Sequence, residues 1–340
     1  MSKAEFIPSS HCILLSNANG IRVKLTPIGA SIVEVIVPDA QSCFQNIALS
    51  LPLNRYGHDP SYAGATLGPH AGRIPNGKLS LGNNAFSLSQ NEKKHHLHGG
   101  FHNFSTMTWD IFRYGNDDSS SFVTFYLLVP DQLEGYPGLR HIQTHYRLDD
   151  ANRLSIHFST KSDKPTHFNL SNHTYWNLGA NMRVSALNQT LQLHASHVWL
   201  NDPDFLAREL IDVQDTPFDF QRPKRLSASL ACCEHPQLQA ANGYNHSFLL
   251  TDTHAPAAIL HDESSRRTLK LFTDYPCVVL YTGGFLDQHT QLADGSSASS
   301  GCGIALEAQE RPMSQGHRHI QPILPGETWE RQICYAFEID

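Results

Sequence analysis

Short apolar runs with the two-residue alternation of β-strands recur along the whole chain. They include IRVKL (Ile21–Leu25), SIVEVIV (Ser31–Val37), SFVTFYLLV (Ser121–Val129), RLSIHF (Arg153–Phe158), RTLKLF (Arg267–Phe272) and PCVVLYT (Pro276–Thr282). Turn-forming sequences such as NANG and PNGK separate these runs. The pattern predicts an all-β sandwich or barrel.

Helical periodicity is nearly absent from the chain. One short helix is expected in PKRLSASLACCEH (Pro223–His235), and the proline-rich DTPFDFQRP before it should prevent extension toward the N-terminus. No stretch has the composition of a linker, and no repeat recurs at a fixed period. We therefore expect residues 1–340 to form one large β domain.

The segment HFNLSNHTYWNLG (His167–Gly179) alternates most clearly. One set of alternate positions carries hydrogen-bonding side chains, including His167 and His173, and the other set is largely apolar. Period two predicts a strand with one face on the core and a polar face turned outward.

Composition narrows the class of partner. The net charge of −7 argues against nucleic acid or an anionic membrane. No apolar run approaches the length of a membrane span, and the first residues lack the apolar core of a secretory signal. The seven cysteines are odd in number and form no CxxC pair, which argues against a disulfide framework. A cytoplasmic protein with a polar, weakly charged ligand is expected.

Histidine is enriched, with 21 residues, and three lie in HHLHGG (His95–Gly100). On a strand, His96 and His98 would share a face and could bind a metal ion. The alternative is a polar strand end in a hydrogen-bonded loop.

Three further residues are candidates for chemistry. His173 could act as a general acid or be a structural histidine with satisfied hydrogen bonds. Glu307 follows the apolar run IAL. Burying a carboxylate there costs free energy, so it is expected only where the group is paired with another or takes part in chemistry. Arg73 in GPHAGRIPNGKL could present donors to hydroxyl groups or form a surface ion pair. Signatures of phosphate loops, dinucleotide loops and nucleophile elbows are missing, so a cofactor-free site of His, Glu and Arg remains.

The order of several motifs resembles the galactose mutarotase (aldose 1-epimerase) family along nearly the whole chain. The landmarks are GRIPNGK (Gly72–Lys78), LHGG (Leu97–Gly100), LEGYPG (Leu133–Gly138), FNLSNHTYWNLG (Phe168–Gly179), TPFDF (Thr216–Phe220), GYNHSFLL (Gly243–Leu250), VLYTG (Val279–Gly283), LEAQ (Leu306–Gln309) and LPGE (Leu324–Glu327). The resemblance implies a large antiparallel β-sandwich whose open face binds a monosaccharide, without metal or cofactor.

The resemblance also implies a reaction, the interconversion of the α and β anomers of an aldose such as galactose. Ring opening removes a proton from the C1 hydroxyl and delivers one to the ring oxygen. By similarity, Glu307 matches the general base and His173 the general acid. Arg73 and His98 match residues that hold the ring hydroxyls. Tyr175 and Trp176 alternate in direction, so at most one of them should stack on the sugar.

Three positions depart from the usual family pattern: Gly72 stands in place of asparagine, Asn245 in place of aspartate and Val279 in place of glutamine. Asn245 is still expected to contact the substrate, but as a neutral amide it should bind a hydroxyl less strongly, by about 1 kcal/mol. The acid–base pair is intact, so the expected function is a mutarotase with weakened or shifted sugar preference.

Two other functions stay open. One is a sugar-binding or sensing protein of the same fold without useful catalysis. The other is a metal-dependent β-barrel isomerase that uses His96 and His98 together with His317 or His319.

Overall fold

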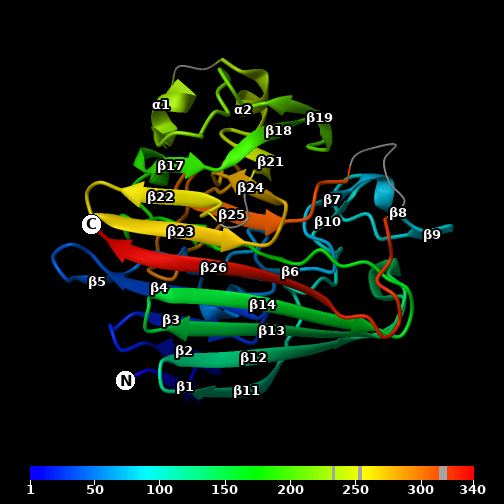
Figure 1. The fold of residues 1–340 in the computed structure, drawn as a ribbon, viewed down its shortest axis with the longest axis horizontal. Helices are drawn as coiled ribbons and strands as arrows, with labels where there is room; N and C mark the ends of the chain where they lie inside the picture. The colour runs from blue at the N-terminus through cyan, green and yellow to red at the C-terminus, as the bar shows by residue number, and fades with distance from the viewer. Residues whose placement is uncertain (232–233, 252–254, 314–319) are drawn as a thin grey trace.

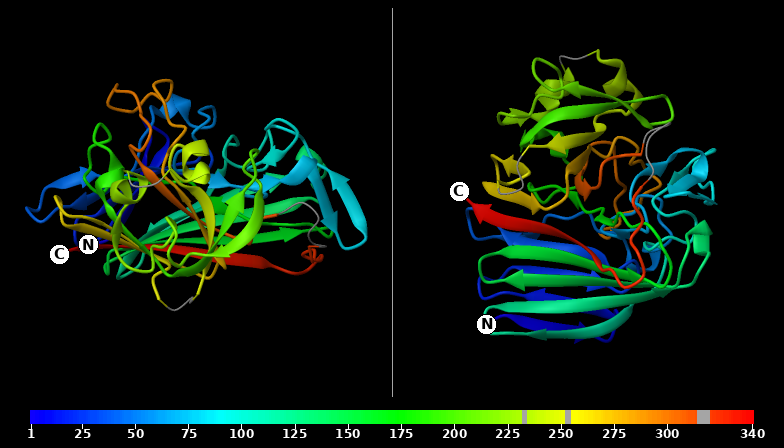
Figure 2. Two further views of the ribbon diagram at one scale, coloured as in Figure 1. Left: turned by 90° about the horizontal axis from the view of Figure 1, so that it is seen from above. Right: turned by 45° about the vertical axis from the view of Figure 1, so that its right-hand side comes forward.

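The computed structural model describes residues 1–231, 234–251, 255–313 and 320–340. Antiparallel sheets dominate it, as Figures 1 and 2 show, which confirms the predicted fold class. The largest sheet has nine strands in the order β11 (Asp110–Asn116), β12 (Ser120–Val129), β13 (Arg140–Asp149), β14 (Arg153–Ser162), β26 (Trp329–Ile339), β23 (Arg267–Thr273), β22 (Ala258–Asp262), β17 (Thr190–Leu193) and β20 (Lys224–Arg225).

A second, five-stranded sheet packs on one end of the large sheet, behind β11–β14 in Figure 1. Its strands are β1 (Lys3–Ile7), β2 (Cys12–Ser16), β3 (Arg22–Thr26), β4 (Ser31–Pro38) and β5 (Phe44–Asn46). The two layers bury their facing apolar side chains, as in a β-sandwich.

A third sheet of six strands covers the other end of the molecule. Its order is β16 (Tyr175–Trp176), β25 (Ile304–Gln309), β24 (Cys277–Tyr281), β21 (Asn245–Leu250), β18 (Ala195–Asn201) and β19 (Ala207–Asp212). Three two-stranded ladders lie beside it: β7 (Arg73–Ile74) with β10 (His96–Leu97), β6 (Thr66–Leu67) with β15 (Ser171–Asn172), and β8 (Lys78–Leu81) with β9 (Asn84–Ser87).

Helices are few and short among the described residues. They are α1 (Leu226–Ala231) and α2 (Pro236–Ala240), with 3₁₀ turns η1 (Leu53–Arg55), η2 (Pro75–Gly77), η3 (Leu133–Gly135) and η4 (Ala186–Asn188). Helix α1 lies within the segment Pro223–His235 that was predicted to be helical. It begins only at Leu226, because Arg225 pairs with Thr190 as part of β20. Residues 232–233 lie outside the described part of that segment. No described helix is long and apolar enough to cross a membrane.

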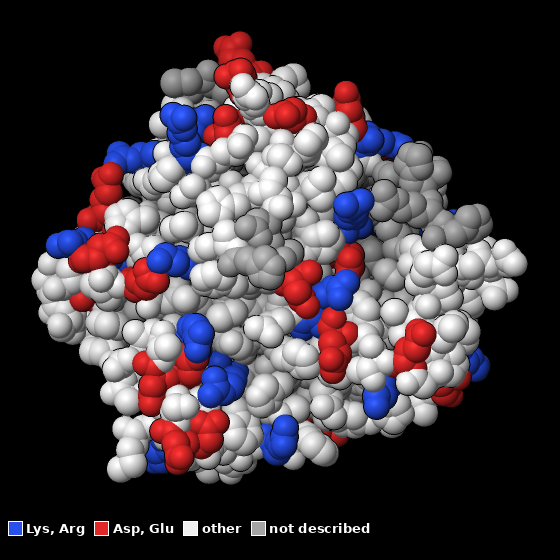
Figure 3. All heavy atoms as spheres, viewed as in Figure 1, with Lys and Arg blue, Asp and Glu red and all other residues white. Residues whose placement is uncertain are grey.

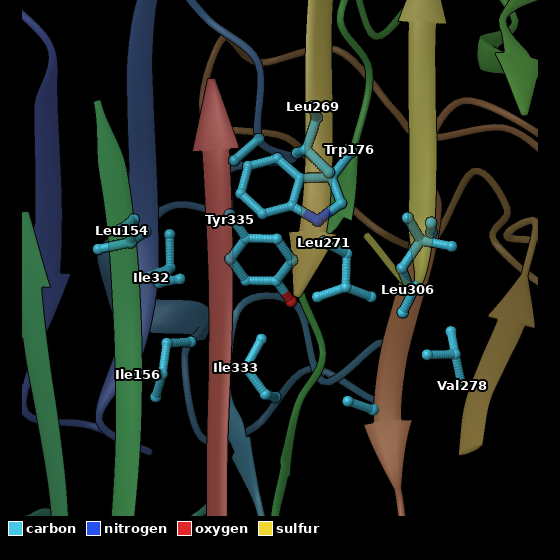
Figure 4. Packing of buried hydrophobic residues seen from close by; sticks show 14 of the residues in the cluster. Ile32, Leu154, Ile156, Trp176, Leu269, Leu271, Val278, Leu306, Ile333 and Tyr335 are labelled. Carbon is cyan, nitrogen blue, oxygen red and sulfur yellow. The ribbon is translucent and has the colours of Figure 1, made fainter. Parts of the chain in front are cut away.

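The core between the sheets centres on aromatic rings. Figure 4 shows Trp176 lying against Tyr335 of β26, with ring centroids 4.8 Å apart. Val278 and Leu306 point into the same core from β24 and β25. Because neighbours in a strand point to opposite faces, Val279 and Glu307 must face away from this core.

The prediction of one continuous strand over His167–Gly179 was wrong. The segment forms only the two-residue strands β15 and β16, and its predicted polar face is buried. Several of its polar side chains instead bind backbone groups: Asn169 Nδ2 donates to the Ala71 carbonyl, and Asn177 Nδ2 to the Val184 carbonyl. Buried amides of this kind satisfy irregular backbone that no sheet ladder satisfies.

Charged side chains of both signs are interspersed over the face in Figure 3. Oppositely charged side chains of the described chain also form ion pairs, such as Arg153 with Asp149 at 2.8 Å. The described residues of this face thus form no extended basic surface of the kind that binds nucleic acid.

Candidate active site

A cavity of about 580 Å³ opens on the face of the six-stranded sheet that is turned away from the core. Strand register explains its floor: Val279 lies opposite Glu307 on one side and Ser247 on the other. Two residues further along β24, Tyr281 lies opposite Asn245. All five side chains line the cavity, since alternate residues of neighbouring strands share a face.

Glu307 lies at the bottom of this cavity and is 3% exposed. Gln309, two residues further along β25, donates from Nε2 to Glu307 Oε2 at 3.0 Å. Burial raises the pKa of Glu307 to about 8, although the Gln309 hydrogen bond and the charge of Arg73 both oppose the rise. The carboxyl group therefore holds a proton at neutral pH.

His173 faces Glu307 from the short connection between β15 and β16. Its Nε2 lies 3.5 Å from Glu307 Oε1, and its ring packs on Tyr175 with centroids 4.8 Å apart. Nδ1 is buried and has no hydrogen-bond partner among the described residues. Burial lowers the pKa of His173 to about 4, so the imidazole is neutral at neutral pH.

Together, the two groups hold one transferable proton over a wide pH range. Transfer from Glu307 to His173 would create a carboxylate and an imidazolium, whose attraction at 3.5 Å offsets part of the cost of burying two charges. The pair can therefore remove a proton from one atom and deliver one to another without a net change in charge. This is the requirement for general acid–base catalysis on a neutral ligand.

His98 also lines the cavity, and the prediction that it shares a strand face with His96 was wrong. β10 ends at Leu97, and His98 has a φ of +50°, which turns it out of the strand. His96 points elsewhere: Nδ1 lies 2.8 Å from the Ser89 carbonyl, and Nε2 lies 2.9 Å from the Tyr136 hydroxyl.

The tautomer of His98 follows from its contacts. The Gly72 backbone N–H donates to His98 Nδ1 at 3.1 Å, so the ring proton of the neutral histidine is on Nε2. Burial holds the pKa of His98 well below its usual value, which keeps the ring neutral. His98 is therefore positioned to donate a hydrogen bond to a ligand hydroxyl.

The same tautomer bears on metal binding. His98, His173 and Glu307 bring three potential ligand atoms within 4.8 Å of one another. A metal ligand needs a free nitrogen lone pair, whereas Nδ1 of His98 accepts from Gly72 and Nε2 carries the proton. As arranged, His98 is a hydrogen-bond donor rather than a metal ligand. His317 and His319 lie outside the described residues.

Arg73 reaches the cavity from β7 and forms a bidentate ion pair there. Its Nε and NH2 donate to the two carboxylate oxygens of Glu92 at 2.6 and 2.7 Å. The guanidinium also lies over the ring of Phe205, 5.4 Å from the centroid. The sequence offered two roles for Arg73, a donor to ligand hydroxyl groups or a member of a surface ion pair. Neither role alone describes it, because Arg73 is ion-paired and also lines the cavity.

The three departures from the family pattern also meet at this cavity. Gly72 has a φ of +85°, and a Cβ there would lie 3.1 Å from Gln309 Oε1. Val279 and Asn245 belong to the floor. The backbone of Asn245 is fixed, since its carbonyl accepts from Asn201 Nδ2 at 2.9 Å and its N–H donates to His246 Nδ1 at 3.0 Å.

Aromatic rings supply the apolar part of the cavity wall. Tyr175 lines the cavity and donates from its hydroxyl to the Ser61 carbonyl, whereas Trp176 is in the core. This agrees with the expectation that at most one of the two contacts a ligand. Tyr62 packs edge-on against His98 with centroids 4.9 Å apart, and Phe285 is 54% exposed beside the cavity. A sugar needs such apolar faces for its C–H groups as well as polar groups for its hydroxyls.

Five site residues were predicted from the sequence, and all five line this cavity: Glu307, His173, His98, Arg73 and Asn245. Sequence reasoning missed Glu92 and Phe205, which lie in loops without a strand pattern. It also missed Gln309, although the alternation of IALEAQ places Gln309 on the same face as Glu307.

The fold and this cavity define an all-β protein with a buried acid–base pair in a sugar-sized pocket, where Arg73 is neutralised by Glu92. Residues 11–336 match the model of the family described as aldose 1-epimerase, and the chain belongs to that family, whose members are isomerases acting on monosaccharides.

Individual relatives support this family assignment. The aldose 1-epimerase of Haemophilus influenzae is 32% identical over 312 residues, which cover 91% of this chain and 89% of that protein. The galactose mutarotase of Bos taurus is 29% identical over 325 residues, covering 94% of this chain and 92% of that protein.

Among solved structures, the galactose 1-epimerase of Lactobacillus acidophilus has a TM-score of 0.86 at 32% identity and covers 96% of this chain and 94% of its own. The aldose epimerase homologue of C. elegans has a TM-score of 0.87 at 26% identity and covers 99% of each chain.

Proposed function

We propose that the chain interconverts the α and β anomers of an uncharged aldohexose such as galactose, with Glu307 and His173 as the catalytic residues. The observation that carries this proposal is the buried pair itself, with Nε2 and Oε1 3.5 Å apart at the bottom of the cavity. The two oxygens that exchange protons during ring opening are both bonded to C1, so adjacent groups can serve both.

The reaction starts from the ionised form of the pair. The Glu307 carboxylate takes the proton of the C1 hydroxyl while the His173 imidazolium gives its proton to the ring oxygen. The C1–O5 bond breaks, and the O1 lone pair forms the C1=O bond of the open-chain aldehyde. Rotation about C1–C2 presents the other carbonyl face, and ring closure returns both protons. Each positioned group contributes about 10²–10⁴-fold.

The remaining polar groups hold the sugar during these steps. His98 donates from Nε2 to one hydroxyl, and the outward-facing atoms of Arg73 and Asn245 bind others. Holding the ring limits the freedom of the open-chain aldehyde, so reclosure competes well with release. Tyr175 and Tyr281 provide apolar surface for the C–H faces.

Galactose is proposed as the first substrate because relatives named galactose mutarotase align over most of the chain. Gly72, Asn245 and Val279 differ from the usual family pattern at the hydroxyl-reading positions, so a weakened or shifted sugar preference is part of the proposal.

The test is polarimetry on freshly dissolved α-D-galactose, followed by a panel of aldoses that differ at single hydroxyls. The proposal expects the protein to speed the approach to anomeric equilibrium of at least one aldohexose. Saturable sugar binding without acceleration of any aldose would replace it with a sugar-binding or sensing function.

A further inference from the structure

The Arg73–Glu92 pair makes the charged wall of the cavity electrically neutral. Both carboxylate oxygens of Glu92 accept from Arg73, at 2.6 and 2.7 Å, and the two side chains are 31% and 18% exposed. A bidentate contact of this kind uses the guanidinium edge that would otherwise bind a ligand carboxylate.

The other charges around the cavity do not restore a cationic site. Of the described lining residues, the second arginine is Arg55, whose NH2 lies 3.1 Å from Asp59 Oδ2. Asp287 adds an acidic group, whereas Glu307 holds a proton at neutral pH. A negatively charged ligand would therefore meet two neutralised arginines and one further acidic side chain.

We propose that Glu92 is a specificity-determining residue that occupies Arg73 and so makes the site select uncharged sugars over sugars bearing a carboxylate. The inference rests on the proposed function, and it assigns to Glu92 the exclusion of one substrate class. A sugar carboxylate could reach Arg73 only by displacing Glu92 or by lying beside it as a like charge, and either arrangement is unfavourable.

Arg73 should stay in place when Glu92 is neutralised, because other contacts hold it. Phe205 lies under the guanidinium, and Phe285 packs edge-on against Phe205 with centroids 5.5 Å apart. The loop carrying Phe205 is tied down by Asp204, whose Oδ1 accepts from Lys93 at 2.7 Å. Loss of the Glu92 charge would thus leave a fixed, uncompensated guanidinium facing the cavity.

The experiment compares galactose with galacturonate, which carries a carboxylate at C6. Anomer exchange of each sugar, and competitive inhibition of galactose exchange by galacturonate, are measured for wild type, Glu92→Gln and Glu92→Asp. Glu263→Gln is the matched control, since Glu263 forms an exposed ion pair with Arg225 and neither residue lines the cavity.

Wild type should discriminate against galacturonate. Glu92→Gln should lower the inhibition constant of galacturonate by about tenfold or more, since at an effective dielectric of ~20 a like charge as far as ~12 Å from the carboxylate already has an effect of that size. Glu92→Asp should keep the wild-type discrimination, and Glu263→Gln should not change it.

An unchanged inhibition constant in folded Glu92→Gln overturns the inference, as does a wild type that binds galacturonate as tightly as galactose. The second result needs no variant, so a misfolded Glu92→Gln does not remove the test. If wild type exchanges no sugar, the proposed function fails, and calorimetric binding of galacturonate to wild type and Glu92→Gln then decides the role of Glu92 separately.

Discussion

Replacing Glu307 with glutamine should stabilise the fold while it slows catalysis. The carboxyl group is fully buried, and burial raises its pKa from 4.5 to about 8. The Glu307→Gln side chain would keep the shape of the original and could still accept from Gln309 Nε2 through its amide oxygen. The substitution would remove the group whose ionisation the buried site opposes.

The sign and size follow from proton linkage. Below about pH 4.5 the carboxyl group is protonated in both the folded and the unfolded chain, so it has no pH-dependent effect. Between this pH and about pH 8 the unfolded chain releases the proton and the folded protein keeps it. The free energy of unfolding therefore falls with pH by about 1.4 kcal/mol per pH unit, to a total of about 5 kcal/mol.

The assay is urea unfolding of wild type and Glu307→Gln at about pH 5 and about pH 8. We expect the variant to gain several kcal/mol relative to wild type at the higher pH and much less at the lower pH. Glu263→Gln, with a side chain that is 69% exposed, controls for the loss of a surface charge. A difference between wild type and Glu307→Gln that is the same at both pH values would refute the reasoning.

Three further predictions concern activity. The profile of kcat/KM against pH should be bell-shaped, with limbs near pH 4 and pH 8. At low pH the pair has no base because His173 is also protonated, and at high pH it has no acid because Glu307 has released the shared proton. A rate that stays constant to high alkaline pH would contradict this prediction. Asn245→Asp combined with Val279→Gln should lower KM for galactose about fivefold or more, since a charge-assisted hydrogen bond is stronger than a neutral one by about 1 kcal/mol. Equal KM values for wild type and the double variant would remove the argument for altered sugar preference. Prolonged chelation should leave the rate unchanged because His98 is held as a donor, and loss of activity that Zn²⁺ restores would contradict that assignment.

Alternation along the strands made much of the fold and part of the site predictable. The runs containing Val279 and Glu307 are β24 and β25, and their period of two decides which residues face the cavity and which face the core. Each of the six apolar runs singled out in the sequence overlaps a strand of the described chain.

Irregular backbone accounts for the errors. His98 leaves the face of His96 because of a left-handed backbone conformation that alternation does not reveal. The segment His167–Gly179 alternates like a strand, but several of its polar side chains form hydrogen bonds with backbone groups of other segments, as Asn169 does with the Ala71 carbonyl. His173 consequently comes from a connection between two short strands rather than from the face of a long one.

Tertiary packing alone creates the wall formed by Glu92, Arg73 and Phe205. The ion pair joins residues 19 apart through the pairing of β7 with β10, and Phe205 arrives from a loop beyond β18. Neither loop has a local pattern that ties it to the other, so single-sequence reasoning had no physical basis on which to join them.

The most direct test of the acid–base pair is polarimetry on α-D-galactose, or on the aldose that the panel selects, with wild type, Glu307→Gln, His173→Asn and the double variant. We expect wild type to accelerate anomer exchange, each single variant to lose about 10²–10⁴-fold in kcat, and the double variant to be no slower than the slower single variant, because the two groups act as a unit. A single variant that keeps a kcat near that of the wild type would contradict the assignment of the pair.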